Sequence, residues 1–151
     1  MIIKLENADK DIAQQIFTVF QRSYHIEAQL IGTDHFPPLF RTVEHIAHSE
    51  TQFYGFIENQ HIAGVIEVVI EEQQLDINSL TVDPNYFRKG IAGKLLSFIL
   101  RELRFSTVLV ETAVVNIPAI NLYQQHGFVE FKKWTPSHGI KKVAFILKAA
   151  D

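Results

Sequence analysis

The segment that most constrains the fold of this chain is a strand that leads through a glycine-containing loop into a helix. Residues 80–96 read Leu-Thr-Val-Asp-Pro-Asn-Tyr-Phe-Arg-Lys-Gly-Ile-Ala-Gly-Lys-Leu-Leu. The strand-like run ends at Val82, Asp83-Pro84 favours a turn, and helical spacing of apolar residues begins after Gly90. Unpaired N–H groups at a helix start, together with the helix dipole, favour an anion and usually a phosphate. The segment therefore predicts a phosphate site, although a plain connection with solvated cations is the alternative.

The remaining pattern of apolar residues and turn signals divides the chain into alternating strands and helices. One apolar helical stripe, for example, contains Ile12, Ile16, Val19 and Phe20. The predicted elements are a strand at 2–6, a helix capped by Asn7 or Asp9 and ending at about Ala28, a loop at 32–38, a short helix at 41–49, strands at 53–58, 62–70 and 73–82, a helix from 90, a strand at 107–115, a helix between Asn116 and Gly127, and strands at 128–134 and 141–148.

The order of these elements, β-α-α-β-β-β-α-β-α-β-β, indicates a mixed sheet. Three consecutive strands with short connections are expected to be antiparallel. The strand–helix–strand unit from Leu75 to Val115 is expected to be a right-handed parallel crossover. We therefore predict one domain over residues 1–151 of the α/β class (an α+β mixed sheet), mostly antiparallel, with helices on both faces.

Composition excludes several kinds of chemistry. The chain has no cysteine, which excludes a thiolate nucleophile and cysteine-ligated metal from this chain. Its 14 Lys and Arg residues against 17 Asp and Glu residues argue against nucleic-acid binding. No apolar run reaches the roughly 18 residues of a membrane span, and the first residues lack a secretory-signal pattern. We expect a cytoplasmic protein without membrane binding, and leave both a monomer and a homodimer open.

Two segments resemble motifs of the GNAT superfamily of N-acetyltransferases. Phe87-Arg88-Lys89-Gly90-Ile91-Ala92 resembles its acyl-CoA pyrophosphate loop, Arg/Gln-x-x-Gly-x-Gly/Ala, except that Phe87 replaces the usual Arg or Gln. Residues 116–128 resemble its Asn-x-x-Ala-x-x-x-Tyr-x-x-x-Gly-Phe signature. The resemblance covers essentially the whole chain in element order. It implies transfer of an acetyl group from acetyl-CoA, as cosubstrate, to a primary amine of a small molecule, peptide or protein in a ternary complex.

The resemblance also implies where acetyl-CoA binds. The strand ending at Val82 and the strand through Glu111 would separate, and the pantetheine arm would pair with backbone in the gap between them. The pyrophosphate would lie on the glycine loop, where Arg88 could supply the cation missing at Phe87. The residues so implied are Leu80, Thr81, Val82, Arg88, Lys89, Gly90, Ile91, Ala92, Gly93, Lys94, Asn116 and Tyr123.

Acetyl transfer to an amine also needs a base and an acid. Glu111 is the predicted base, because it precedes Tyr123 by the spacing found in the ribosomal-protein alanine N-acetyltransferases that this stretch resembles. Glu67 and Asp76 are the alternative bases. Tyr123 is the predicted acid that protonates the departing CoA thiolate. The alternative for Glu111 is an exposed strand residue without a catalytic role. The alternative for Tyr123 is a helix residue whose ring only packs on the sheet.

Other residues carry weaker signals. His45 and His48 share a short predicted helix that follows His35, but two histidines without a third ligand are weak support for a metal, and we predict none. The same region, with the loop at 32–38, is a candidate wall of the acceptor pocket. The alternative function is a non-catalytic acyl-CoA-binding or sensing module on the same fold. The identity of the amine stays open.

Overall fold

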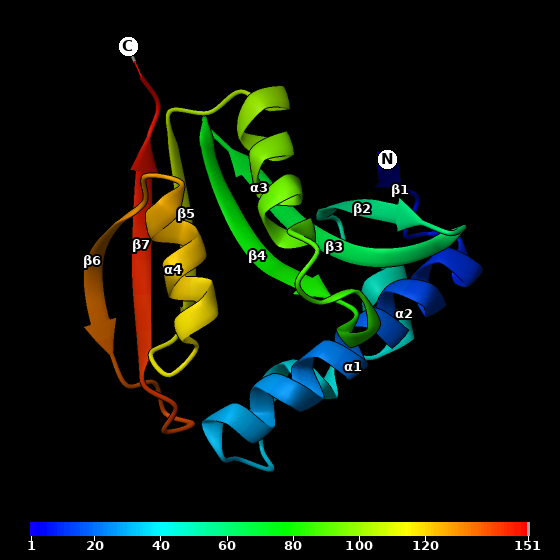
Figure 1. The fold of residues 1–151 in the computed structure, drawn as a ribbon, viewed down its shortest axis with the longest axis horizontal. Helices are drawn as coiled ribbons and strands as arrows, with labels where there is room; N and C mark the ends of the chain where they lie inside the picture. The colour runs from blue at the N-terminus through cyan, green and yellow to red at the C-terminus, as the bar shows by residue number, and fades with distance from the viewer. Residues whose placement is uncertain (151) are drawn as a thin grey trace.

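The computed structural model describes residues 1–150 as seven strands, four helices and two short 3-10 turns (Figure 1). The strands are β1 (Ile2–Leu5), β2 (Gln52–Glu58), β3 (His61–Glu71), β4 (Gln74–Val82), β5 (Thr107–Ala113), β6 (Val129–Trp134) and β7 (Lys142–Lys148). The helices and turns are α1 (Lys10–Ile31), η1 (Pro37–Phe40), α2 (Val43–Ala47), η2 (Pro84–Tyr86), α3 (Ile91–Glu102) and α4 (Ile117–Gln125).

All seven strands form one mixed sheet in the order β1-β2-β3-β4-β5-β7-β6. The hairpins β2–β3 and β3–β4 are antiparallel, as predicted, and each closes with a tight turn whose two residues have positive φ, Asn59-Gln60 and Glu72-Gln73. The pair β4–β5, which α3 connects, is parallel. The prediction of a mostly antiparallel mixed sheet is therefore confirmed.

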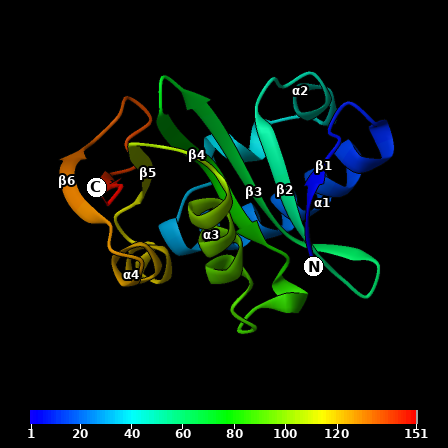
Figure 2. The ribbon, with the colours of Figure 1, turned by 90° about the horizontal axis from the view of Figure 1, so that it is seen from above.

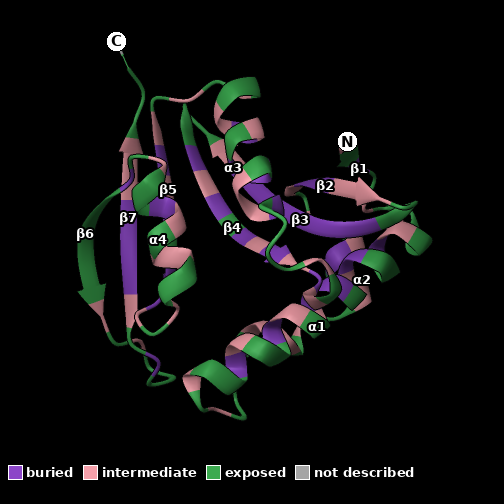
Figure 3. Cartoon of the chain, in the orientation of Figure 1, coloured by how far each residue is buried: buried purple, intermediate pink, exposed green. Residues whose placement is uncertain are grey.

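The helices cover both faces of the sheet (Figure 2). On one face α1 and α2 bury a core that includes Ile16, Phe20 and Ile46. On the other face α3 and α4 bury a second core that includes Leu95, Ile99 and Tyr123. The central strands β3 and β4 are buried along much of their length, whereas the edge strand β6 is exposed (Figure 3). No helix within residues 1–150 is both long and apolar enough to cross a bilayer.

The first helix is longer than predicted. It continues past Ala28 to Ile31 and ends at Gly32, which adopts a left-handed conformation with φ of 82°. The apolar stripe ends at Ala28, but the physical stop is the glycine, because it adopts positive φ at little cost. At the other end Asp9 caps the helix, and its carboxylate accepts from the N–H of Asp11. Asn7 instead donates to main-chain carbonyls beside α2.

The second helix is shorter than predicted. It spans only Val43–Ala47. Its start is fixed at Thr42, which forms a capping box with His45 in which each side chain accepts a bond from the other residue's backbone N–H. The predicted loop at 32–38 overlaps a 3-10 turn that begins at Pro37, where proline's missing N–H is tolerated. Arg41, expected inside the helix, lies before it and is free to point into the protein.

The parallel strands β4 and β5 separate before β4 ends. Their pairing runs from Gln74 with Thr107 to Ile77 with Val110, whereas β4 continues to Val82. Antiparallel pairing of β5 continues on its other side along β7. The sheet therefore opens on the α4 side of β4, as the resemblance to N-acetyltransferases implied.

Candidate active site

Two adjoining pockets lie where β4 and β5 separate. The first, which we call the α3 pocket, has a volume of about 510 Å³ and lies between the C-terminal half of α1, the end of β4 and the starts of α3 and α4. The second, the β5 pocket, has a volume of about 470 Å³ and is lined by α1, η1, β4, β5 and the segment leading into β7. Five residues line both pockets and so define their junction: Glu27, Leu80, Asn116, Ala119 and Tyr123.

The glycine loop forms the end of the α3 pocket and has the geometry of a phosphate site. Gly90 precedes α3 with φ of 73° and gives the helix no side-chain cap. The first helical bond at this end is donated by the N–H of Lys94 to the carbonyl of Gly90, so the earlier N–H groups at the helix start remain available. A Cβ at Gly90 would meet nothing within 4 Å. The residues of the predicted loop that line this pocket are Arg88, Gly90, Ile91, Ala92 and Gly93.

Two predicted cations point away from the α3 pocket. The ammonium of Lys89 lies 3.6 Å from the carboxylate of Glu58 and 5.2 Å from the ring centroid of Tyr86. The ammonium of Lys94 lies over the ring of Phe56, and Lys94 lines a neighbouring hollow with Arg101 and His126. Arg88 is therefore the loop cation that the structure brings to this pocket.

On β4, alternation along the strand separates the three predicted residues. Leu80 and Val82 line the α3 pocket. Thr81 points to the opposite face, where its buried hydroxyl has no hydrogen-bond partner among residues 1–150. Only the backbone of Thr81 is therefore placed to serve a ligand in the gap.

Tyr123 of α4 lies at the junction of the two pockets. Asn116 caps α4 by accepting from the N–H of Ala119, and the predicted left-handed glycine, Gly127, follows the helix with φ of 90°. The Tyr123 ring packs against Phe128 and Phe145 and is buried. Burial, reinforced by the negative charge of Glu27, raises the pKa of the Tyr123 phenol well above its ordinary value. Tyr123 is therefore a neutral hydrogen-bond donor.

Glu111, the predicted base, lines the β5 pocket but not the α3 pocket. Its carboxylate accepts a 2.6 Å hydrogen bond from the ammonium of Lys142, and half of its side chain is exposed. The structure therefore brings Glu111 and Tyr123 to one pocket, but places Glu111 away from the junction.

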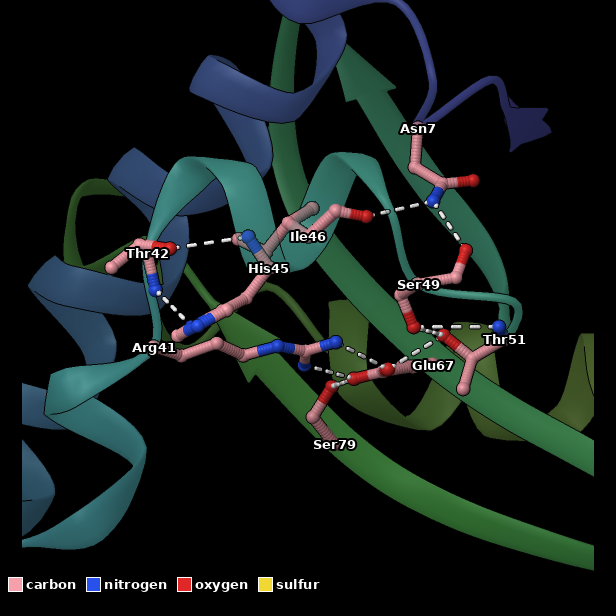
Figure 4. Close-up of polar contacts among 9 residues, drawn as sticks. All are labelled: Asn7, Arg41, Thr42, His45, Ile46, Ser49, Thr51, Glu67 and Ser79. Carbon is pink, nitrogen blue, oxygen red and sulfur yellow. Dashed lines mark hydrogen bonds and ion pairs between the residues drawn. The ribbon is translucent and has the colours of Figure 1, made fainter.

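The alternative base Glu67 is buried in a cluster of donors. Its carboxylate accepts two bonds from Arg41, of 2.6 and 2.8 Å, one from Thr51 and one from Ser79 (Figure 4). Both carboxylate oxygens are occupied, and Glu67 lines neither pocket. Glu67 instead anchors the guanidinium of Arg41, a residue that lines the β5 pocket. Asp76, the other alternative, lines neither pocket and accepts from Gln74.

Glu27 is a site residue that the sequence analysis missed. It lines both pockets, and its Oε1 accepts a 3.1 Å bond from the side-chain amide of Asn116. Burial raises the pKa of the Glu27 carboxyl, while the Asn116 bond and the charge of Lys142 act in the opposite direction. A signal was present, because Glu27 lies seven residues after Phe20 and so falls on the apolar stripe of α1.

The three histidines of the predicted acceptor region lie apart from the junction. His45 completes the cap of α2, and the imidazole of His48 bonds to the Glu44 carbonyl. Within residues 1–150, no three His, Cys, Asp or Glu side chains gather as a metal site. The residues of this region that line the β5 pocket are instead Phe36, Pro37, Pro38 and Arg41.

The fold and the site define a mixed-sheet α/β protein with a pocket that ends at an uncapped helix start, beside two parallel strands that separate. The chain belongs to the acetyltransferase (GNAT) family, whose model matches residues 13–128. It is 34% identical over 148 residues to the UPF0157 protein YqkA of Bacillus subtilis strain 168, a match that covers 97% of this chain and 43% of that protein. The chain thus spans less than half the length of the curated relatives it matches.

Solved structures confirm the fold. The ribosomal-protein-S18-alanine N-acetyltransferase of Escherichia coli superposes with a TM-score of 0.77 and 20% identity, covering 98% of this chain and 92% of that one. A GNAT family acetyltransferase from Elizabethkingia anophelis, solved with acetyl-CoA bound, has a TM-score of 0.61 and 14% identity, covering 66% and 76%. At these identities the likeness shows the shared fold, and family membership supports an acetyltransferase.

Proposed function

We propose that this chain transfers the acetyl group of acetyl-CoA to a primary amine by direct attack in a ternary complex. The observation that carries the proposal is the pair of pockets that meet at Tyr123, one of which ends at an open helix start. One pocket suits a long phosphate-bearing cosubstrate and the other a separate acceptor. Because the chain contains no cysteine, an acetyl-cysteine intermediate on this chain is excluded.

The α3 pocket fits acetyl-CoA. The pyrophosphate would accept hydrogen bonds from the N–H groups at the start of α3, and the open space at Gly90 allows its close approach. The pantetheine arm would add to the free edge of β4 along Leu80–Val82, as an extended peptide adds to a sheet. Its thioester would then reach the junction. An acetyl-CoA complex of a family member with the same fold supports this choice of cosubstrate.

The β5 pocket is proposed to hold the amine acceptor. Its walls combine the apolar surface of Phe36, Pro37 and Pro38 with the charged side chains of Glu111 and Lys142. This mixture suits a small amine or a peptide end that carries both apolar and polar groups.

The chemical step needs a deprotonated amine and a stabilised leaving group. A lysine-like amine with a pKa near 10.4 is neutral in only about one molecule in 2,500 at pH 7. A carboxylate in the β5 pocket, for which the sequence predicts Glu111, would take the proton. Tyr123 would donate a hydrogen bond to the departing sulfur. Because the Tyr123 pKa is raised, stabilisation of developing charge by this bond is its main contribution.

The test is incubation of the protein with acetyl-CoA and a panel of amines and short peptides. Release of free thiol that depends on the amine is the expected result, and its product should carry one added acetyl group. A non-catalytic acyl-CoA-binding module would bind CoA in a titration but release no thiol with any acceptor. Absence of CoA binding would contradict the assignment of the α3 pocket.

A further inference from the structure

The reacting carbonyl of acetyl-CoA must lie where the acceptor pocket meets the cosubstrate pocket. Of the five residues that line both pockets, only Glu27 and Tyr123 carry titratable side chains. They come from α1 and α4, which cover opposite faces of the sheet and meet through the gap between β4 and β5. An acid and a base thus border the same point from two sides.

The other carboxylates in this region are already bound to other side chains. Glu111 is bound to Lys142 at 2.6 Å and lines only the β5 pocket. Glu67 is enclosed by Arg41, Thr51 and Ser79. By contrast, Glu27 takes part in no ion pair among residues 1–150, and the hydrogen bond from Asn116 occupies one of its oxygens. Its second oxygen is therefore available at the junction.

We propose that Glu27 accepts the proton of the attacking amine, an inference that rests on the acetyl transfer proposed above. In the step, the amine nitrogen attacks the thioester carbonyl carbon, the C–N bond forms and the C–S bond breaks. The electron pair of the broken bond goes to sulfur, and the Tyr123 hydroxyl stabilises the thiolate by donating a hydrogen bond to it. The nitrogen's surplus proton passes to Glu27 and from there through solvent to the CoA thiolate. The products are the N-acetyl amine and CoA thiol.

The surroundings of Glu27 set its strength as a base. The charged or titratable groups that share the β5 pocket with it are Tyr24, Arg41, Glu111, Tyr123, His138 and Lys142, and those of the α3 pocket are Tyr86 and Arg88. Burial is the largest influence and raises the pKa of the Glu27 carboxyl. A raised pKa brings the group closer to neutral pH, where a general base is most effective.

The charge of Glu27 also links the base to the acid. Its negative charge contributes to the raised pKa of the Tyr123 phenol. When Glu27 takes up a proton, this contribution disappears and the phenol becomes a better donor. Transfer of the nitrogen's proton to Glu27 therefore strengthens the hydrogen bond that Tyr123 donates to the sulfur.

The test measures acetyl transfer by the wild type and by three variants, Glu27→Gln, Glu27→Asp and Glu111→Gln. Rates are measured from pH 5 to pH 9, at pH values about one unit apart, with two acceptors, alanyl-alaninamide and butylamine. These amines differ in pKa by roughly two units, so an acidic limb of kcat that both acceptors share belongs to the enzyme. In Glu27→Gln, the glutamine keeps the side-chain oxygen that accepts the hydrogen bond from Asn116. We therefore expect this variant to bind acetyl-CoA with unchanged affinity, which calorimetry measures. The exposed Glu50→Gln is the matched control for loss of one carboxylate.

We expect Glu27→Gln to lower kcat about 10²–10⁴-fold and to abolish the shared acidic limb, while Glu27→Asp keeps the limb at a lower rate. Carbon NMR of the Glu27 side-chain carboxyl should show it titrating above ordinary glutamates. An intact limb and rate in Glu27→Gln, loss of the limb only in Glu111→Gln, or an ordinary titration of Glu27 would each overturn the role of Glu27. No thiol release by the wild type with either acceptor would instead count against acetyl transfer itself.

Discussion

Glu27 on α1 and Asn116 at the start of α4 are joined by a 3.1 Å hydrogen bond although they lie 89 positions apart in the chain. The two helices belong to opposite faces of the sheet, so the bond passes through the gap that β4 and β5 leave. It fixes the carboxylate at the junction of the two pockets. Asn116 therefore has two tasks, because the same side chain also caps α4.

The first prediction is that Glu27→Gln stabilises the protein at neutral pH. The folded-state pKa of Glu27 is raised, so any stability linked to its titration is present below the unfolded-state pKa and lost as pH rises through the folded value. Removing the charge should raise the free energy of unfolding at pH 7, with a smaller gain at pH 4. Urea unfolding at both pH values measures this. A gain that is larger at pH 4 would contradict the burial of this charge.

The second prediction concerns Gly90. Alanine at its φ of 73° is strained by about 1–2 kcal/mol and places a methyl group where phosphate is proposed to approach. We expect Gly90→Ala to weaken acetyl-CoA binding at least about tenfold, which is roughly 1.4 kcal/mol. Gly32→Ala is the matched control, since Gly32 has φ of 82° and equally open surroundings but lines neither pocket. Equal affinity losses in both variants, measured by calorimetry, would argue for strain alone.

The third prediction is that Tyr123→Phe separates binding from chemistry. It removes one hydroxyl and keeps the ring that packs on Phe128 and Phe145. Turnover should fall about 10²–10⁴-fold while acetyl-CoA affinity persists, because the lost interaction forms mainly in the transition state. Tyr54→Phe, whose hydroxyl bonds to Gln52 outside both pockets, is the control. A wild-type rate in Tyr123→Phe under chemistry-limited conditions would remove Tyr123 from the mechanism.

The fourth prediction concerns the buried pair of Arg41 and Glu67. Glu67→Ala leaves the guanidinium and two hydroxyls without their shared acceptor, and should cost about 3–5 kcal/mol, nearer the lower value because part of Arg41 reaches solvent. Replacing both partners, with Arg41→Met and Glu67→Leu, should recover much of that loss. Chemical unfolding measures both. A Glu67→Ala protein as stable as the wild type would show that the cluster contributes little to the fold.

The fifth prediction concerns Phe87, where the family pattern usually has Arg or Gln. Phe87 is 43% exposed and lines the α3 pocket near Arg88. Phe87→Arg adds a cation beside the proposed pyrophosphate, so acetyl-CoA affinity should stay the same or rise, most clearly at low salt. Calorimetry at two salt concentrations is the measurement. A large loss of affinity would mean that the ring of Phe87 packs a surface the ligand needs.

The parts of the site that follow local rules were predictable from the sequence. The glycine loop before α3 and the Asn116 cap of α4 depend on a few adjacent residues, and both have the expected geometry. The directions of Lys89 and Lys94 were not predictable, because Glu58 and the ring of Phe56 attract them from β2, a strand distant in the chain. Tertiary contacts override the charge pattern of the loop at these two positions.

Glu27 was missed for a similar reason. Its place on the apolar stripe of α1 is visible in the sequence, but its importance depends on a pocket formed by α4 and β4, far along the chain. The helix boundary predicted at about Ala28 also placed Glu27 at a fraying end. The true end at Gly32 puts Glu27 inside a full helical turn, which holds its side chain in place.

The early end of the β4–β5 pairing divides the sheet into two half-sheets, β1 to β4 and β5 with β7 and β6, joined across only four residue pairs. Apart from these pairs, the two halves meet through the core beneath α3 and α4. A cosubstrate lying in the gap would act as an added strand between them and make their unfolding more cooperative. The cooperativity with which the two half-sheets unfold should therefore depend on whether a ligand occupies the gap between β4 and β5.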